Sequence, residues 1–289
     1  MRVMVLGAGG MLGHDLVATA PPEVTLFPFP RATLDITKHD AVAATLADVR
    51  PDVVINAAAY TLVDRAESEP QEAVRVNGAA VGALGRMARQ VGARVIHFST
   101  DYVFDGTATE TYTEERLRHP INAYGMSKLA GEKDLRASGA QCLIVRTQWL
   151  FGVHGKSFPK TMWERARAGR ATKVVRDQTG RPTYAPDLAA AVWTLLRRGV
   201  CGVMHVANRG EATWLDVAAH IFARAGKPDL LTACATADYP TPARRPRYSV
   251  LDTARAEQAL GGPLPAWQDA IARHLSTVRD DFAHQLSDR

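Results

Sequence analysis

The stretch Arg2-Val-Met-Val-Leu-Gly-Ala-Gly-Gly-Met-Leu-Gly13 opens the chain and decides its fold. A short apolar run of strand length leads into closely spaced glycines, which are Gly7, Gly10 and Gly13. One glycine allows a tight turn, one lets backbone amides approach a pyrophosphate, and one permits close packing of helix on strand. A helical segment follows, and its N-terminus carries partial positive charge. The stretch therefore predicts a dinucleotide-binding unit, with a purely structural turn as the alternative.

The remainder of the first half repeats the alternation of strand and helix. We expect strands over residues 24–27, 52–56, 94–98 and 141–146, and helices over residues 38–49 and 70–91. Pro28 and Pro30 are expected to end the second strand. This order predicts an α/β fold of the Rossmann type, with a doubly wound parallel sheet.

The second half is more irregular than the first. We expect a dinucleotide-binding domain over residues 1–150 and a smaller, mixed α/β substrate-binding region over residues 151–289. The second region is too small to fold alone, so we expect it to cap the strand ends of the first, with the chain crossing between the two. Thr213 and Asp216 have the spacing of a helix capping box.

Composition narrows the class of protein. The net charge of +5 is spread among interspersed acidic and basic residues, which does not suit a nucleic-acid surface. The three cysteines lack metal-ligand spacing and suit a reducing compartment. The start of the chain is not a signal peptide, and no run reaches membrane-spanning length. We therefore expect a soluble cytoplasmic protein that binds neither nucleic acid nor membrane.

Two stretches after the glycine loop suggest how a cofactor is held. Arg31 stands after the second strand, where NAD enzymes carry a carboxylate. An arginine there suits a 2′-phosphate and favours NADPH, with NADH as the alternative cofactor and a surface arginine as the alternative reading. Asp35 and Ile36 are expected along the adenine. The small side chains of Ala58 and its neighbours would let a cofactor lie against the backbone at a strand end.

Tyr124 and Lys128 form the candidate catalytic pair. They are four residues apart on a predicted helix, so their side chains share one face. A tyrosine titrates near pH ~10, and a neighbouring cation should lower that pKa toward the range of acid–base catalysis. Thr100, at the end of the fourth strand, could donate a hydrogen bond to a substrate carbonyl. These groups predict hydride transfer to a ketone with proton delivery by Tyr124.

Together these motifs resemble the extended class of the short-chain dehydrogenase/reductase superfamily, and within it the dTDP-4-dehydrorhamnose reductase family. The similarity runs from the first strand to about residue 253. It is carried by several motifs, which are Asn56-Ala-Ala-Ala-Tyr-Thr61, Ser99-Thr-Asp-Tyr-Val-Phe-Asp-Gly106, Tyr124-Gly-Met-Ser-Lys128, Arg146-Thr-Gln-Trp149 and Arg245-Pro-Arg-Tyr-Ser249. The resemblance implies NADPH-dependent reduction of the 4-keto group of dTDP-4-dehydro-β-L-rhamnose to dTDP-β-L-rhamnose.

The resemblance also assigns roles to residues. It makes Tyr124 the proton donor, Lys128 its partner and the holder of the nicotinamide ribose, and Thr100 the group that stabilises the developing oxyanion. It places three residues on the nucleotide sugar, which are Asp101, Tyr102 and Trp149. It places a further set on the cofactor, which is Gly10, Met11, Leu12, Asp35, Ile36, Ala59, Tyr60 and Thr61. The tryptophan has independent support, because an aromatic face can stack on a sugar; ordinary core packing is its alternative.

Departures from the family pattern leave alternatives open. Asp15 and Pro186 stand where some members bind Mg²⁺ between subunits, so we predict no metal. The rival functions are another nucleotide-deoxysugar 4-ketoreductase or epimerase, and a non-catalytic NADP-binding subunit like that of methionine adenosyltransferase. The expected partner is a dTDP-sugar, and a homodimer is left open.

Overall fold

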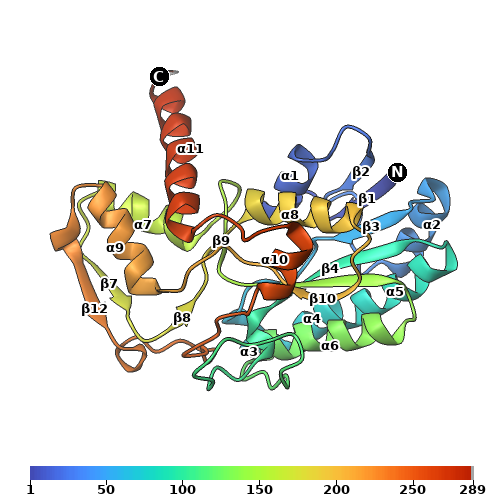
Figure 1. Cartoon of the computed structure of the whole chain (residues 1–289), viewed down its shortest axis with the longest axis horizontal. Coiled ribbons are helices and arrows are strands. Elements are labelled where there is room, and N and C mark those ends of the chain that lie inside the picture. The colour runs from blue at the N-terminus through green and yellow to red at the C-terminus, as the bar shows by residue number, and fades with distance from the viewer. Residues whose placement is uncertain (288–289) are drawn as a thin grey trace.

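A computed structural model describes the backbone of residues 1–287 and the side chains of residues 1–278. Its centre is a six-stranded parallel sheet in the order β10-β5-β4-β3-β1-β2 (Figure 1). The strands are β1 (Arg2–Leu6), β2 (Thr25–Phe29), β3 (Val53–Asn56), β4 (Arg94–Thr100), β5 (Cys142–Thr147) and β10 (Gly202–His205). The predicted Rossmann-type α/β fold is thus confirmed.

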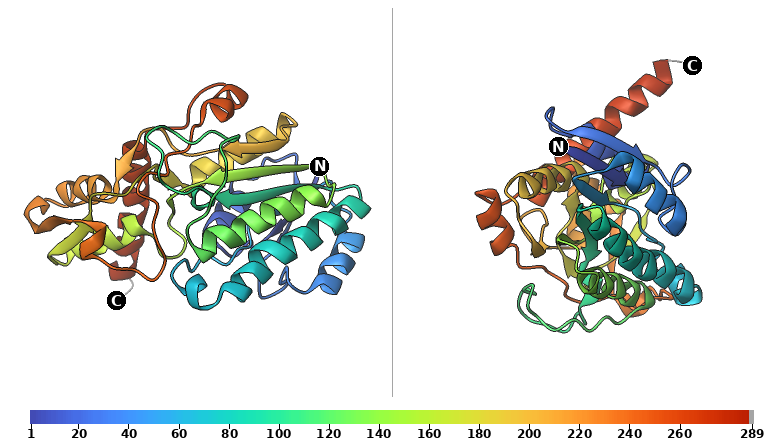
Figure 2. Two further views of the ribbon diagram at one scale, coloured as in Figure 1. Left: turned by 90° about the horizontal axis from the view of Figure 1, so that it is seen from below. Right: turned by 90° about the vertical axis from the view of Figure 1, so that its right-hand side faces the viewer.

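Helices cover both faces of this sheet (Figures 1 and 2). One apolar layer joins the sheet to α1 (Met11–Ala18), α8 (Ala185–Arg197) and α10 (Ala254–Leu260). The opposite layer joins it to α2 (His39–Val49), α5 (Ala80–Gln90) and α6 (Ala123–Ala137). The strands alternate their side chains between these layers, so Val3 and Val5 belong to one and Met4 and Leu6 to the other.

The strand register explains how distant motifs meet. β1 lies between β2 and β3, and the connections that leave β1 and β3 pass to opposite faces of the sheet, which opens a crevice beyond the carboxyl ends of the strands. Leu6 is level with Asn56, and Thr100 is level with Thr147. The segments that follow these strand ends therefore emerge along one edge of the sheet.

The second strand corrects one prediction. β2 continues through Pro28 to Phe29, and Pro28 pairs with Val5. β2 is the edge strand of the sheet, where a missing backbone N–H can face away from its neighbour. Pro28 therefore does not end the strand as we expected, whereas Pro30 follows its last residue.

The predicted helix over residues 70–91 is present, but its winding changes along its length. α3 (Arg65–Ser68) and α4 (Pro70–Val74) lead into a π-helical turn, η1 (Arg75–Ala79), and then into α5. α6 crosses η1 so closely that a Cβ on Gly131 would lie 2.0 Å from the Asn77 carbonyl oxygen. The small residue is thus required by the crossing.

A second, smaller apolar cluster lies beyond the carboxyl edge of the sheet. It is built from β6 (Leu150–Phe151), α7 (Phe158–Arg167), β7 (Thr172–Val175), β8 (Thr179–Gly180), β9 (Thr183–Tyr184), β11 (Ala212–Thr213), α9 (Trp214–Arg224), η3 (Pro228–Leu230), β12 (Leu231–Cys234), η4 (Thr236–Asp238) and α11 (Trp267–Ser287). The predicted capping box of α9, made by Thr213 and Asp216, is present.

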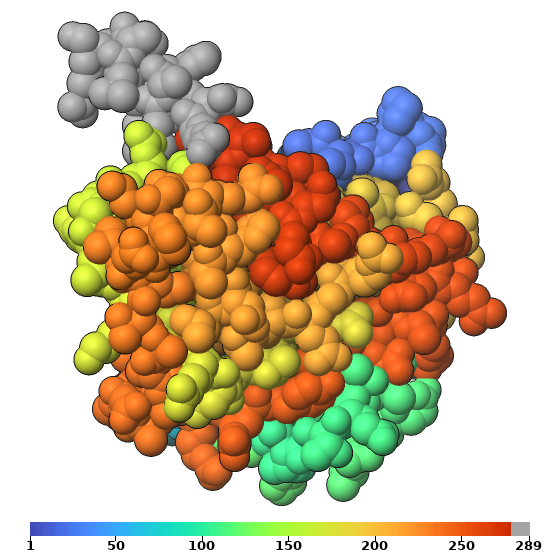
Figure 3. Space-filling model, turned by 60° about the vertical axis from the view of Figure 1, so that its left-hand side comes forward, coloured from blue at the N-terminus to red at the C-terminus, as the bar shows by residue number. Residues whose placement is uncertain are grey.

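The chain passes repeatedly between the cluster and the sheet. α8, β10 and α10 return to the sheet between segments that belong to the cluster. Figure 3 shows the late segments of the chain, in orange and red, against the green loop around residue 110. Backbone hydrogen bonds join Tyr112 to Val250 and Asp252 at that contact. The domain boundary near residue 150 stays a prediction.

A buried ion pair ties the sheet to α6. Arg146 on β5 donates to both carboxylate oxygens of Glu132 on α6, at 2.8 and 2.7 Å. Ser99 on β4 donates to the same carboxylate at 2.5 Å, and the Arg146 guanidinium also contacts Nε2 of His205 on β10 at 3.2 Å. Both charged side chains are almost fully buried, so removal of either would leave an uncompensated charge.

Replacing Gly131 with alanine tests the crossing of α6 and η1. We expect Gly131→Ala to lower the free energy of unfolding by about 1–3 kcal/mol, because the new methyl group meets backbone rather than a movable side chain. Gly78→Ala in the same interface is the control, since its nearest neighbour is the Ala130 methyl group at 3.2 Å. Urea denaturation measures both, and equal losses would contradict the close-crossing argument.

Candidate active site

The glycine loop between β1 and α1 is shaped to receive phosphate groups. Gly7 has a φ of +73°, and a Cβ there would lie 2.5 Å from the backbone nitrogen of Ala58. A Cβ on Gly13 would lie 2.2 Å from the Gly7 carbonyl oxygen. Gly10 is the N-cap of α1 and offers no side chain to its amides, and the first turn of α1 holds no acidic residue. The loop therefore fits the pyrophosphate of a dinucleotide.

A cavity of about 360 Å³ beside this loop suits an adenosine. It brings together half of the predicted cofactor residues, which are Gly7, Gly10, Arg31, Asp35, Ile36, Ala58 and Ala59. The Arg31 side chain is 77% exposed, and its Nε lies 3.3 Å from the Asp35 carboxylate. Burial acts to raise the pKa of Asp35, but hydrogen bonds from Thr37 and the charge of Arg31 hold it below its usual value. Arg31 is thus exposed at the mouth of the cavity, where its guanidinium is paired with Asp35.

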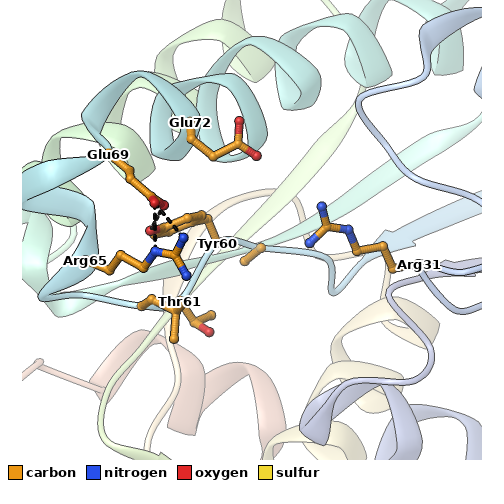
Figure 4. Close-up of a pocket in the computed structure, with 8 residues that line it drawn as sticks. Arg31, Tyr60, Thr61, Arg65, Glu69 and Glu72 are labelled. Carbon is orange, nitrogen blue, oxygen red and sulfur yellow. Dashed lines mark hydrogen bonds and ion pairs between the residues drawn. The ribbon is translucent and has the colours of Figure 1, made fainter.

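Tyr60 and Thr61 lie beside a neighbouring pocket (Figure 4). The Tyr60 hydroxyl donates to Glu69 at 2.9 Å, and Arg65 donates to the same carboxylate at 2.8 Å. Arg31 lies across this pocket from that cluster. Glu69 thus holds the Tyr60 phenol in this pocket, while Thr61 also lines the larger cleft that contains Tyr124.

Asn77 fixes the backbone at Tyr60, a role that the sequence did not reveal. Its Oδ1 accepts from the Tyr60 amide, and its Nδ2 donates to the Tyr60 carbonyl, both at 2.9 Å. The same Nδ2 donates to the Ser127 hydroxyl on α6 at 2.9 Å. Asn77 thus connects the cofactor segment to the helix that carries the catalytic pair. A polar residue on a buried helix face was the available signal.

A cleft of about 510 Å³ unites the predicted catalytic and substrate residues. Its lining contains Met11, Leu12, Ala59, Thr61, Thr100, Asp101, Tyr102, Tyr124, Lys128 and Trp149. These residues come from segments that follow β1, β3, β4 and β5, and from α6. The lining also includes Lys156 and Trp214, which sequence reasoning missed because neither belongs to a recognised motif.

Lys128 lies at the buried end of the cleft. Its ammonium donates to the Phe98 carbonyl at 2.6 Å. Burial lowers the pKa of Lys128 to about 8, although the negative charge of Glu132 opposes the shift. His97 lies close enough for the Lys128 charge to act on it; burial and that charge keep the pKa of His97 well below its usual value, so this imidazole is neutral.

The ionisation of Tyr124 differs from the prediction. We expected Lys128 to lower the pKa of this phenol, but burial and the charge of Asp101 raise it above its usual value, against a hydrogen bond with Thr100. The Lys128 ammonium is engaged with the Phe98 carbonyl. Tyr124 is therefore protonated at neutral pH, which is the state that a proton donor requires.

Trp149 stacks on a second tryptophan. Its ring centroid lies 3.6 Å from that of Trp214, and the planes differ by 7°. A Cβ on Gly180 would lie 2.6 Å from Cε2 of Trp149, so the ring is closely packed there as well. Trp149 also has a φ of +48°, which is unfavourable for a bulky residue. The pair forms one wall of the cleft; the predicted contact of Trp149 with a sugar stays a prediction.

Comparison with known proteins decides the family. The sequence model of the RmlD substrate binding domain matches residues 1–280. The chain belongs to this family. Among the relatives of this RmlD-family chain, the dTDP-4-dehydrorhamnose reductase of Escherichia coli strain K12 is 39% identical over 293 residues, which cover 96% of this chain and 98% of the relative.

Other similar proteins extend this picture. The dTDP-4-dehydrorhamnose reductase of Bacillus anthracis, solved in complex with NADP, has a TM-score of 0.91 at 35% identity and covers 96% of this chain and 99% of its own. A probable dTDP-4,6-dihydroxy-2-methyloxan-3-one 4-ketoreductase of Streptomyces antibioticus is 39% identical over 277 residues, covering 94% of this RmlD-family chain and 93% of the relative.

Arg31→Ala tests the adenosine end of the site. We expect the dissociation constant for NADPH to rise about tenfold or more and that for NADH to change little, because a charge-assisted contact to the 2′-phosphate is lost. Nicotinamide fluorescence titration measures both constants. Arg65→Ala, in the neighbouring pocket, is the matched control. An unchanged ratio of the two constants would contradict the proposed role of Arg31.

Proposed function

We propose that this chain is an NADPH-dependent reductase of the 4-keto group of dTDP-4-dehydro-β-L-rhamnose, which yields dTDP-β-L-rhamnose. The observation that carries the proposal is the meeting of Thr100, Tyr124 and Lys128 in one cleft with the phosphate-binding glycine loop. The match of almost the whole chain to named reductases supports the same activity.

The residues of the cleft suit the two halves of a ketone reduction. Bound NADPH supplies the hydride. Tyr124 is protonated at neutral pH and gives its proton to the carbonyl oxygen as negative charge develops there. Thr100 stands beside Tyr124 to stabilise that oxygen. Lys128, buried on the same helix, holds the ribose next to the nicotinamide and contributes positive charge below about pH 8.

A second cavity accounts for the nucleotide part of the substrate. It has a volume of about 700 Å³ and shares Tyr102 and Trp214 with the catalytic cleft. Arg165, Lys173 and Arg245 line it and offer positive charge to a diphosphate. Arg245 donates to Asp64 at 2.9 Å, so this side chain is already aligned by a carboxylate.

Two alternative functions compete with this proposal. The Streptomyces relative supports a different dTDP-deoxysugar as the substrate of a 4-ketoreductase. A non-catalytic NADP-binding subunit would need the glycine loop but not Thr100, Tyr124 and Lys128 together, so the cleft favours an enzyme over a binding protein.

The remaining assignments concern membrane association, the cellular compartment, the oligomeric state and the need for a metal. No helix in the described part of the chain combines the length and apolarity needed to cross a membrane. The described cysteines, Cys142, Cys201 and Cys234, are free thiols, which supports our proposal of a reducing, cytoplasmic setting. A homodimer and independence from a metal both stay predictions.

Purified protein with NADPH and dTDP-4-dehydro-β-L-rhamnose tests the function directly. We expect the absorbance of the reduced nicotinamide to fall and dTDP-β-L-rhamnose to form. Parallel reactions with other dTDP-4-keto-deoxysugars separate the reductase from its first alternative. Binding of NADPH without its oxidation by any of these sugars would instead favour the regulatory subunit.

Tyr124→Phe tests the proton donor. We expect kcat to fall by at least ~10²-fold, because the phenylalanine keeps the ring but supplies no proton. The dissociation constant for NADPH should change little, and fluorescence titration checks it. Tyr248→Phe is the control, because its hydroxyl contacts Glu211 and the residue lines neither of the two cavities. A near-normal kcat for Tyr124→Phe would mean that another group protonates the oxygen.

A further inference from the structure

The hydroxyl of Thr100 is already hydrogen-bonded within the cleft, to the neighbouring Asp101 and Tyr102 and also with the phenol of Tyr124. It accepts from the backbone amide of Tyr102 at 3.1 Å and donates to Oδ1 of Asp101 at 2.9 Å. A hydroxyl carries a single proton. While that proton points at the Asp101 carboxylate, Thr100 has none to offer to the carbonyl oxygen of a substrate.

Asp101 is buried, so its ionised form is unfavourable. Its residue surface is only 2% exposed, and it follows β4 as the first residue of η2 (Asp101–Val103). No described ion pair involves this carboxylate. A buried carboxylate without a cation tends to take up a proton, and a protonated carboxyl can donate to Thr100 instead of accepting from it.

From this geometry we propose that Asp101 is a positioning residue, whose protonation turns the Thr100 hydroxyl from the carboxyl group toward the substrate carbonyl. The proposal rests on the proposed ketone reduction. With Asp101 protonated, the carbonyl oxygen meets two donors, Thr100 and Tyr124. With Asp101 ionised, the carbonyl oxygen meets Tyr124 as its single donor. The negative charge of Asp101 then also lies close to the Tyr124 phenol.

The surroundings of Asp101 set the pH at which this change occurs. Burial raises the pKa of Asp101 to about 7, against the hydrogen bonds of Ser249 and Thr100. The titratable groups that sense its charge are the phenols of Tyr102 and Tyr124, and both remain protonated through this range. Arg245 and Asp64 act on Tyr102 from the loops that cover it. Lys128 titrates near pH 8 at the same cleft.

Asp101→Asn separates the protonation effect from a structural one. The carboxamide has nearly the same shape, can donate to Thr100 and cannot ionise. We expect kcat/KM of the wild-type chain to fall about tenfold per pH unit above about pH 7, toward the ~10²-fold loss expected when one oxyanion donor is withdrawn. In Asp101→Asn this loss should disappear, which leaves only the fall caused by Lys128.

Two controls sharpen the comparison. Asp105→Asn changes a carboxylate in the same segment that bonds to Tyr112 instead of Thr100, so it should keep the wild-type pH profile. Thr100→Val removes the hydroxyl that Asp101 controls, so adding Asp101→Asn to it should bring no recovery at high pH. Parallel alkaline losses in the wild-type chain and Asp101→Asn would overturn the proposal, as would an Asp101→Asn rate depressed equally at every pH.

An infrared measurement tests the same group without turnover. The difference spectrum between about pH 6 and pH 9 should show a carboxylic-acid band that is present in the wild-type chain and absent in Asp101→Asn. If Asp101 is ionised at both pH values, the proposal fails even in an active reductase. If the band titrates but no dTDP-4-keto sugar is reduced, the proposed function fails while the protonation of Asp101 stands.

Discussion

The buried pair of Arg146 and Glu132 is the interaction on which the site depends. It joins the carboxyl end of β5 to α6, and Ser99 adds the end of β4 to the same carboxylate. Both charges are buried away from water, so each is stabilised by its oppositely charged partner. Because Lys128 lies one turn before Glu132 on α6, the pair fixes the helix face that carries the proposed catalytic tyrosine and lysine.

Parallel register then determines what this anchored helix meets. All strands of the central sheet end at one edge, so the glycine loop, the alanine segment and Thr100 come together there regardless of their distance in sequence. Asn77 holds the alanine segment to α6 through Tyr60 and Ser127. The cofactor side and the catalytic side of the cleft thus share one scaffold.

Local sequence was sufficient for the fold and for the motif residues that line the cleft, but not for Lys156 and Trp214. Strand and helix alternation, glycine spacing and the tyrosine–lysine pair are encoded within short segments, and the structure places them as predicted. The predictions that were wrong depended on neighbouring residues that lie far away in the sequence. Pro28 could continue a strand only because β2 is an edge. Burial and the charge of Asp101 raise the pKa of Tyr124, while the Lys128 ammonium is bound to the Phe98 carbonyl. Trp214 lines the cleft because it stacks on Trp149, a contact that no local sequence motif indicates.

The repeated passage of the chain between sheet and cluster has an evolutionary meaning. Segments of the cluster lie before α8, between β10 and α10, and after α10, while α8, β10 and α10 themselves pack on the sheet. Such segments can change length and lining without disturbing the strand ends that hold the reacting groups. The lining of the cleft can therefore vary segment by segment, whereas the cluster cannot be exchanged as one continuous stretch of chain.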